Sequence, residues 1–201
     1  MLVVVLAHVV DAAPSEHTEE ELVGVITMQP RAPHAPQYAL ALLGRLKREQ
    51  RMAEHTAWVD RMLSMPRLLA GREELILALQ NIQIAQRFLD ARLSMAHATR
   101  SRLPEDWRRA ARAFVDTADV SRRWSESPDV RTGHRVVSIT DDATYYAGWC
   151  WEQAGEVLEA LASYGAVPRG DLRAGAAQRI VTLGVRSVVR LHVDGAAWLA
   201  R

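Results

Sequence analysis

The chain has 201 residues, one cysteine and a formal net charge of +1 at pH 7. A single cysteine excludes an intramolecular disulfide scaffold and any zinc site built from several cysteines. A net charge near zero argues against a protein that coats a polyanion over its whole surface. The 49% of hydrophobic residues is too high for a disordered chain. We therefore expect a globular fold with a core of its own.

The basic residues show a compositional bias. All but one of the 25 are arginines, the exception being Lys47, and Asn81 is the only asparagine. Arginine has GC-rich codons, whereas lysine and asparagine have AT-rich ones. The composition therefore indicates a GC-rich bacterial source, and codon usage explains most of the arginine excess without selection for phosphate binding.

The first ten residues are strongly apolar but short. A membrane-spanning helix needs about 20 apolar residues, and a signal peptide needs a basic start and a small-residue cleavage site. The segment Met1–Val10 is followed by Asp11 and shows neither pattern. The sequence therefore predicts a cytoplasmic protein without a membrane segment. A short continuous apolar run has no readable period, so these ten residues are compatible with a strand or a helix.

Prolines divide the chain into three parts. Pro30, Pro33 and Pro36 interrupt any helix, because proline lacks the backbone donor and fixes φ. We therefore expect an N-terminal apolar segment and short helix over 1–28, an extended connector over 29–36 and a helical bundle domain over 37–201.

Helical patterns fill most of the chain. Thr18 followed by Glu21 matches a capping box, Pro66 ends one helical run and Pro104 opens another. We expect helices over 18–28, 37–64, 72–101, 104–123, 140–164 and 171–198. The predicted fold class is all-α, a single bundle of six or seven helices.

The segment 72–101 is apolar on two opposite faces. One stripe advances in steps of three and four residues and contains Leu75, Leu79, Ile82, Gln86, Leu89, Leu93 and Ala96. The other side of the helix carries Leu77, Ile84, Phe88 and Met95, because each residue turns the helix by about 100°. A helix that is apolar on both faces is expected to pack on both. We therefore predict that 72–101 is the central helix of the bundle, with Gln86 hydrogen-bonded to a neighbouring backbone.

Arg92 and His97 are separated by four residues. This Arg-x4-His spacing resembles the motif of the HEPN ribonucleases, helical proteins that place such a pair at a dimer cleft. The resemblance implies that His97 acts in acid–base chemistry at the ribose 2′-hydroxyl and that Arg92 stabilises phosphate charge. It covers six residues, and the position after the arginine, often polar in that family, is Leu93 here.

Residues 141–159 concentrate aromatic side chains and carboxylates. A wall for a cationic or aromatic ligand could be formed by Tyr145, Tyr146, Trp149 and Glu152. The alternative is that the rings plug the end of the bundle and the glutamates are solvated or pair with the last helix. That pairing would join Glu152 to Arg186, and Glu156 or Glu159 to Arg179.

Five arginines surround the corner near Pro104: Arg100, Arg102, Arg108, Arg109 and Arg112. They would allow nucleic-acid binding, but Glu105 and Asp106 interrupt the cluster and no DNA-reading module accompanies it. The sequence has no His and carboxylate spacing typical of a metal site, no phosphate loop and no dinucleotide-binding turn. We therefore expect no metal and no cofactor.

These patterns favour binding over catalysis. We expect a helical interaction protein that acts as a homo-oligomer or as a subunit or regulatory partner of a larger assembly. Two alternatives stay open: a ribonuclease that uses Arg92 and His97, and a small-ligand-binding protein with its pocket on 141–159.

Overall fold

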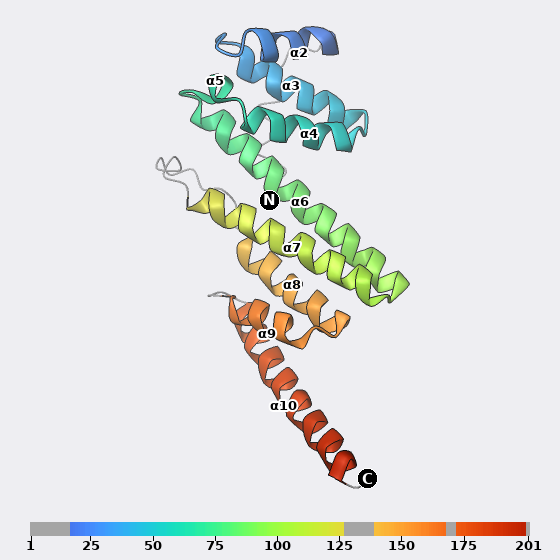
Figure 1. Cartoon of the computed structure of the whole chain (residues 1–201). Coiled ribbons are helices and arrows are strands. Elements are labelled where there is room, and N and C mark those ends of the chain that lie inside the picture. Colours follow the sequence, from blue (N-terminus) through green and yellow to red (C-terminus); the bar gives the residue numbers. More distant parts are fainter. Residues whose placement is uncertain (1–16, 127–138, 168–171, 200–201) are drawn as a thin grey trace. The chain divides into compact units, whose positions relative to one another are not determined.

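The computed structural model describes residues 17–126, 139–167 and 172–199, with side chains up to Ser187 in the last range. Every regular element in these ranges is an α-helix (Figure 1), which confirms the all-α fold class. The helices are α2 (Glu19–Met28), α3 (Ala35–Arg48), α4 (Met52–Leu63), α5 (Pro66–Leu69), α6 (Glu73–Ser101), α7 (Pro104–Ser125), α8 (Thr140–Ala154), α9 (Val157–Gly165) and α10 (Leu172–Leu199). Within the described residues, no helix has the length and apolar character needed to cross a membrane.

The described residues hold nine helices where six or seven were predicted. One predicted helix breaks at Gln50 (φ 59°) and another at Gly155 (φ 81°), both in the left-handed region. At each break a helix ends, and a backbone N–H just beyond it donates a hydrogen bond to a carbonyl of the last helical turn. Arg51 N donates to the Leu46 carbonyl over 2.9 Å, and Glu156 N to the Trp151 carbonyl over 3.0 Å. The short helix α5, which follows Met65, accounts for the third extra helix.

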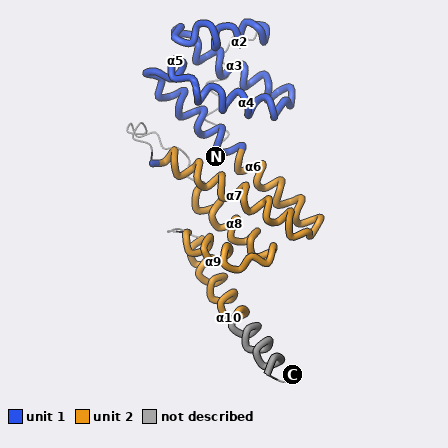
Figure 2. Tube along the Cα trace, viewed as in Figure 1, with its two compact units in different colours: residues 1–86, 126–136 blue, residues 87–125, 137–201 orange. Residues whose placement is uncertain are grey.

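The chain forms two compact units, and the boundary between Gln86 and Arg87 falls inside α6 (Figure 2). Unit 1 contains α2 to α5 and the first half of α6, and unit 2 contains the second half of α6 and α7 to α10. The predicted divisions at residues 28 and 36 do not coincide with this boundary. The ambiguous residues 1–10 lie outside the described part of the chain.

Unit 1 has a core of branched aliphatic side chains. Leu42, Leu46 and Leu79 are fully buried in it, together with residues from α2, α4 and α5. The predicted capping box at Thr18 is present at the start of α2. In unit 1, four short helices and half of a long one therefore pack their apolar faces together.

The proline-rich connector forms turns, so the prediction of an extended segment is wrong. The Arg72 guanidinium holds these turns: Nη1 donates to the carbonyls of Pro30 (2.7 Å) and Leu68 (3.0 Å), and Nη2 donates to that of Ala32 (2.6 Å). One side chain thus ties two carbonyls of the connector, those of Pro30 and Ala32, to α5; the Ala32 carbonyl also accepts from Ala35 N over 3.0 Å.

Unit 2 has a core of alanines and aromatic rings. The buried alanines lie on α6, α7 and α8, and the rings of Phe114, Trp107 and Trp149 pack among them. Gly148 on α8 lies directly under Tyr164 on α9, and a Cβ at this glycine would meet the Tyr164 ring at 2.8 Å. Small residues therefore allow the helices of unit 2 to approach closely.

The first stripe of α6 is covered in one half of the helix and exposed in the other. In unit 1, Leu75 and Leu79 of the first stripe are buried (4% and 0% exposed), whereas in unit 2 Leu89 and Leu93 of that stripe are 51% and 59% exposed. The opposite face is the packed one in unit 2, where Phe88 meets Phe114. The prediction that both faces are covered along 72–101 is therefore wrong for the second half of α6.

Gln86 interrupts the first stripe and is hydrogen-bonded, as predicted. Its Oε1 lies 2.9 Å from His55 Nδ1, and its Nε2 donates to the Met52 carbonyl over 3.4 Å. His55 is buried in the apolar surroundings of α4, and burial lowers the pKa of its imidazole. His55 is thus a neutral core residue with a polar partner.

Candidate functional site

The second half of α6 presents an apolar surface to solvent. We call Leu89, Leu93 and Ala96 the leucine face; all three are exposed and share one side of the helix. Arg100, one turn further on, lies on the same side and turns its Nε back to the Ala96 carbonyl (3.3 Å). A contiguous exposed apolar stripe on an otherwise packed helix is typical of a binding surface.

Charged residues border the leucine face on both sides. Arg92 follows Leu89 by three residues and lies on one border, while Asp90 and His97 lie on the other. All three are exposed, and Asp90 makes no ion pair with any residue that the structure describes. The face therefore has an apolar centre and polar borders, as a helix that binds another helix has.

His97 lies beside a buried carboxylate. Its Nε2 is 3.3 Å from Asp106 Oδ2; the Asp106 side chain is 8% exposed and that of His97 is 59% exposed. Arg109 Nη1 lies 3.2 Å from the other oxygen of Asp106. Because Asp106 lies in the first turn of α7, the helix N-terminus also stabilises its negative charge. The pair orients an accessible imidazole, which is the arrangement that acid–base chemistry uses.

Arg92 does not join this group within one chain. His97 follows Arg92 by five positions, so the two side chains leave α6 about 140° apart, on opposite borders of the leucine face. They would come together only around something seated on that face. The role that the sequence assigned to Arg92 and His97 stays a prediction.

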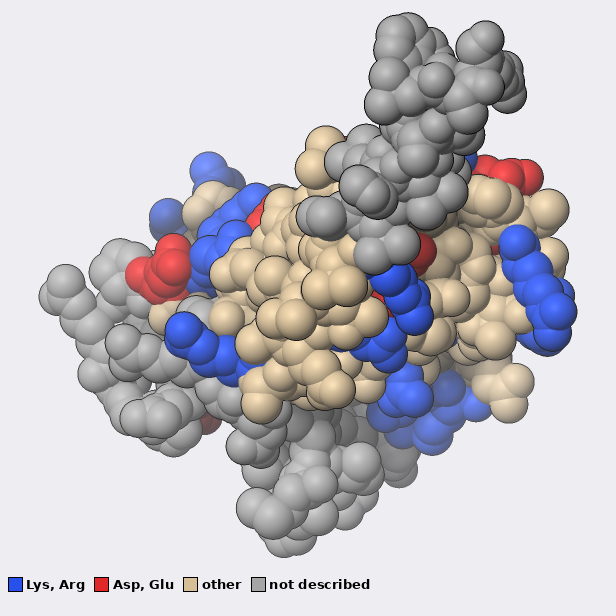
Figure 3. Space-filling view, turned by 90° about the horizontal axis from the view of Figure 1, so that it is seen from below, with Lys and Arg blue, Asp and Glu red and all other residues tan. Residues whose placement is uncertain are grey.

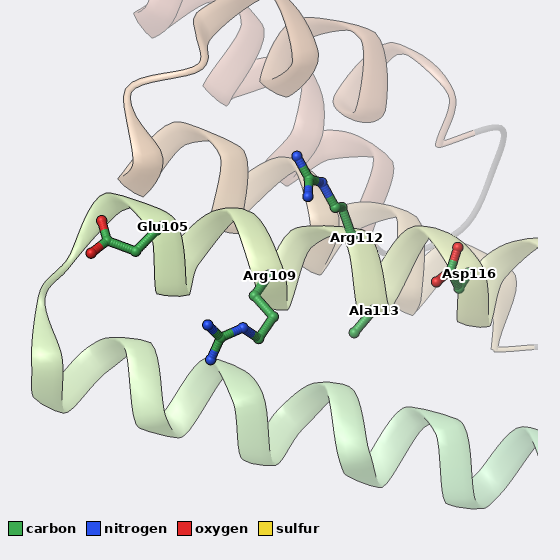
Figure 4. Close-up of a pocket in the computed structure, with 5 residues that line it drawn as sticks. All are labelled: Glu105, Arg109, Arg112, Ala113 and Asp116. Carbon is green, nitrogen blue, oxygen red and sulfur yellow. The ribbon is translucent and has the colours of Figure 1, made fainter.

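The arginines near Pro104 are partly neutralised. Arg108 Nε pairs with Glu156 Oε1 at 2.6 Å, and Arg109 pairs with Asp106. Arg109 and Arg112 also line an open groove along α7 with Glu105, Ala113 and Asp116 (Figure 4). In the close-up Arg109 extends toward α6 whereas Arg112 extends to the other side of α7.

The groove along α7 is mixed in charge. Two carboxylates and two guanidinium groups line the groove. On the face seen in Figure 3, basic groups stand in separate places among uncharged surface. The groove therefore supplies no continuous basic stripe for a phosphate backbone. Nucleic-acid binding through Arg100, Arg102 and their neighbours stays a prediction.

The predicted ligand wall on α8 is part of a packed cluster. Tyr145 meets the ring of Tyr164, Tyr146 stacks on Phe114, and Trp149 meets Trp107 edge to face, so all three are half-buried.

Glu152, whose side chain is 7% exposed, already has partners for both oxygens. Tyr164 Oη donates to Oε2 over 3.0 Å, and Arg179 donates to Oε1 over 3.2 Å. A ligand would have to displace one of them. Burial raises the pKa of the Tyr164 phenol, and the Glu152 carboxylate adds to that effect. The phenol is therefore a hydrogen-bond donor at neutral pH.

The predicted glutamate–arginine pairing is wrong in register. Glu152 pairs with Arg179 instead of Arg186, and Glu156 pairs with Arg108 on α7. The break at Gly155, which ends α8 four residues before Glu159, changes which carboxylates reach α10. In the described residues no group of three or more histidines, cysteines or carboxylates is placed to hold a metal ion.

Two partners in this region were missed from the sequence. Asp106 follows His97 by nine residues across the Pro104 corner, and an antiparallel helix pair brings such positions together. That signal was available. Tyr164 as the partner of Glu152 had no signal, because the contact depends on the break at Gly155.

Comparisons of the chain with protein-family models, with curated proteins and with solved structures give no match. The function proposed below therefore rests on the geometry of the chain itself.

Proposed function

We propose that this chain is a helical interaction protein that self-associates through the leucine face, in the cytoplasm of a GC-rich bacterium. The observation that supports the proposal is the exposure of Leu89 and Leu93 at 51% and 59%, on a helix whose opposite face is packed. Leaving two neighbouring leucines half in water costs about 1 kcal/mol each relative to covering them. A partner that covers them recovers that free energy.

The size of this surface predicts a weak association. Stable interfaces bury roughly 800 Å² on each partner, and two leucines and an alanine supply less. The loss of translational and rotational freedom costs at least about 4 kcal/mol. We therefore expect a dissociation constant in the range of about 10–1000 μM, with charged borders adding specificity.

Light scattering across a concentration series tests the proposal. The wild-type mass should rise above the 22.4 kDa of one chain as concentration increases. Leu93→Asp should abolish the rise, because it places a charge in the apolar centre. Leu158→Asp is the matched control, since Leu158 is a 78% exposed leucine outside the face. A constant 22.4 kDa mass for the wild type would contradict the proposal.

A second candidate function is RNA cleavage with His97 as the acid–base group. The observation that favours it is the buried Asp106 carboxylate 3.3 Å from the exposed imidazole. A carboxylate that orients a histidine strengthens such catalysis. Arg92 lies on the far border of the leucine face and does not join His97 within one chain, so the candidate rests on His97 and Asp106.

Cleavage of a labelled single-stranded RNA tests this candidate. His97→Ala and Asp106→Asn should each lower the cleavage rate, by about 100-fold or more for His97. His34→Ala, a change at another exposed histidine, should leave the rate unchanged. Absence of cleavage by the wild type at concentrations where it is dimeric would exclude the candidate.

A further inference from the structure

We infer that the occupant of the leucine face is a second copy of this chain, whose α6 runs antiparallel to the first. The twofold axis passes between Leu93 and Ser94, and Asp90 of each copy pairs with His97 of the other. This inference rests on the proposed self-association and specifies its geometry.

The border of the leucine face sets this arrangement. Asp90 and His97 are seven residues apart, so they lie within about 20° of each other around α6 and about 10.5 Å apart along it. When a twofold axis perpendicular to both helices relates them, each border of one helix faces the same border of the other. The two facing borders then run in opposite directions. If the axis passes midway between Asp90 and His97, Asp90 of each copy therefore faces His97 of the other, which gives two symmetric pairs.

The charges on that border are suited to such pairing. Asp90 is exposed and makes no ion pair within the described residues. The imidazole of His97 approaches Asp106 with Nε2, which leaves Nδ1 for a second carboxylate. The two symmetric pairs fix the register of an otherwise small apolar contact.

A parallel pair of helices is disfavoured by Arg100. In a parallel twofold pair each residue on the face meets its own copy, so Arg100 would meet Arg100, and like charges repel. In the antiparallel pair the two Arg100 residues are about 20 Å apart along the helices, and the like charges that approach are the two Arg92 residues, on the border away from Asp90 and about 4.5 Å apart along the helices. A parallel pair would instead place Asp90 beside Arg92 of the partner, which gives the two arrangements different mutational signatures.

Single cysteines and charge deletions distinguish the outcomes. Cys150 does not interfere, because it is fully buried and burial raises the pKa of its thiol to about 12. Under mild oxidation, Leu93→Cys should give a covalent dimer, whereas Arg100→Cys should not, because a disulfide needs Cα atoms within about 7 Å. Leu158→Cys serves as the control for random collision.

The charge deletions test the pairing itself. Asp90→Ala should weaken the non-covalent dimer about five-fold. Arg92→Ala should strengthen it, because the antiparallel pair brings the Arg92 residues of the two copies together on the other border. A covalent Arg100→Cys dimer, or equal weakening by both deletions, would overturn the antiparallel register while leaving self-association intact. Absence of a Leu93→Cys dimer would overturn both, and is the result expected if residues 1–10 of the same chain cover the face.

Discussion

The two units fill their cores with different kinds of side chain. Unit 1 fills its core with branched aliphatic side chains such as Leu42 and Leu46. Unit 2 brings its helices close with alanines and Gly148, and fills the remaining space with aromatic rings. A core of the first kind fails when a side chain becomes smaller, and a core of the second kind fails when one becomes larger.

The same contrast runs through α6. Leu75 and Leu79 pack against the aliphatic core of unit 1, but in unit 2 the helix turns its alanines Ala91 and Ala98 inward. The leucines of that half are left on the outside. The same apolar stripe is therefore a core contact in unit 1 and a candidate interface in unit 2.

The largest expected effect is at Leu42 in unit 1. Leu42→Ala should lower the free energy of unfolding by about 3 kcal/mol, because it removes buried methyl groups and leaves a cavity. Leu42→Met, which nearly conserves volume, should cost less than about 1.5 kcal/mol. Urea denaturation followed by circular dichroism measures both. Equal losses would show that the core of unit 1 does not depend on filled volume.

The next effect is at Gly148 in unit 2. Gly148→Ala should destabilise the protein by about 1–3 kcal/mol, because the new methyl group would overlap the Tyr164 ring. Gly184→Ala is the matched control, since nothing lies within 4 Å of its Cβ position in α10. That change should stabilise the helix by up to about 1 kcal/mol. Thermal unfolding of the two variants should shift in opposite directions; a stabilised Gly148→Ala would refute the close approach.

A pH effect of moderate size is expected from His55 in unit 1. Burial lowers the pKa of His55 below its ordinary value of 6.5 in the folded state, so the unfolded chain binds a proton first as pH falls. The free energy of unfolding should therefore decrease below about pH 6.5, by at most about 1.4 kcal/mol per pH unit, until the folded pKa is reached.

His55→Gln provides the control for this pH effect, because it keeps a polar partner for Gln86 and removes the titration. Unfolding by urea between pH 7.5 and 5 should show a shallower decrease for the variant than for the wild type. Parallel curves for the two proteins would assign the decrease to other groups.

The smallest effect is at Gln50, the left-handed residue between α3 and α4. Gln50→Gly should raise the free energy of unfolding by about 0.5–1 kcal/mol, because glycine adopts a positive φ without steric cost. Gly155→Ala should have the opposite sign for the same reason. Differential scanning calorimetry resolves both; a destabilised Gln50→Gly would mean that the Gln50 side chain contributes contacts of its own.

Much of the helical architecture could be read from local signals. The capping box at Thr18 and the first-turn Pro104 place the starts of α2 and α7 to within a residue. Both signals act through backbone donors and acceptors close in sequence, so they hold whatever the rest of the chain does. The break at Gln50 had no such signal, because glutamine rarely adopts a positive φ.

The candidate site was less predictable for a physical reason. Periodicity tells which residues share a side of a helix, but it does not tell what covers that side. The stripe from Leu75 to Ala96 therefore predicts core along its whole length, although its second half is exposed. The orientation of His97 depends on Asp106 across a helix corner, and the partners of Glu152 depend on the break introduced at Gly155.

Thiol reactivity at position 93 tests the central claim most directly. In the Leu93→Cys variant under reducing conditions, the rate of modification by a maleimide should fall as protein concentration rises through the dimerisation range. The Leu158→Cys variant should react at one rate throughout, since Leu158 is 78% exposed and lies away from the face. If the thiol introduced by Leu93→Cys reacted as fast as that introduced by Leu158→Cys at every concentration, the leucine face would be open to water and the account would be contradicted.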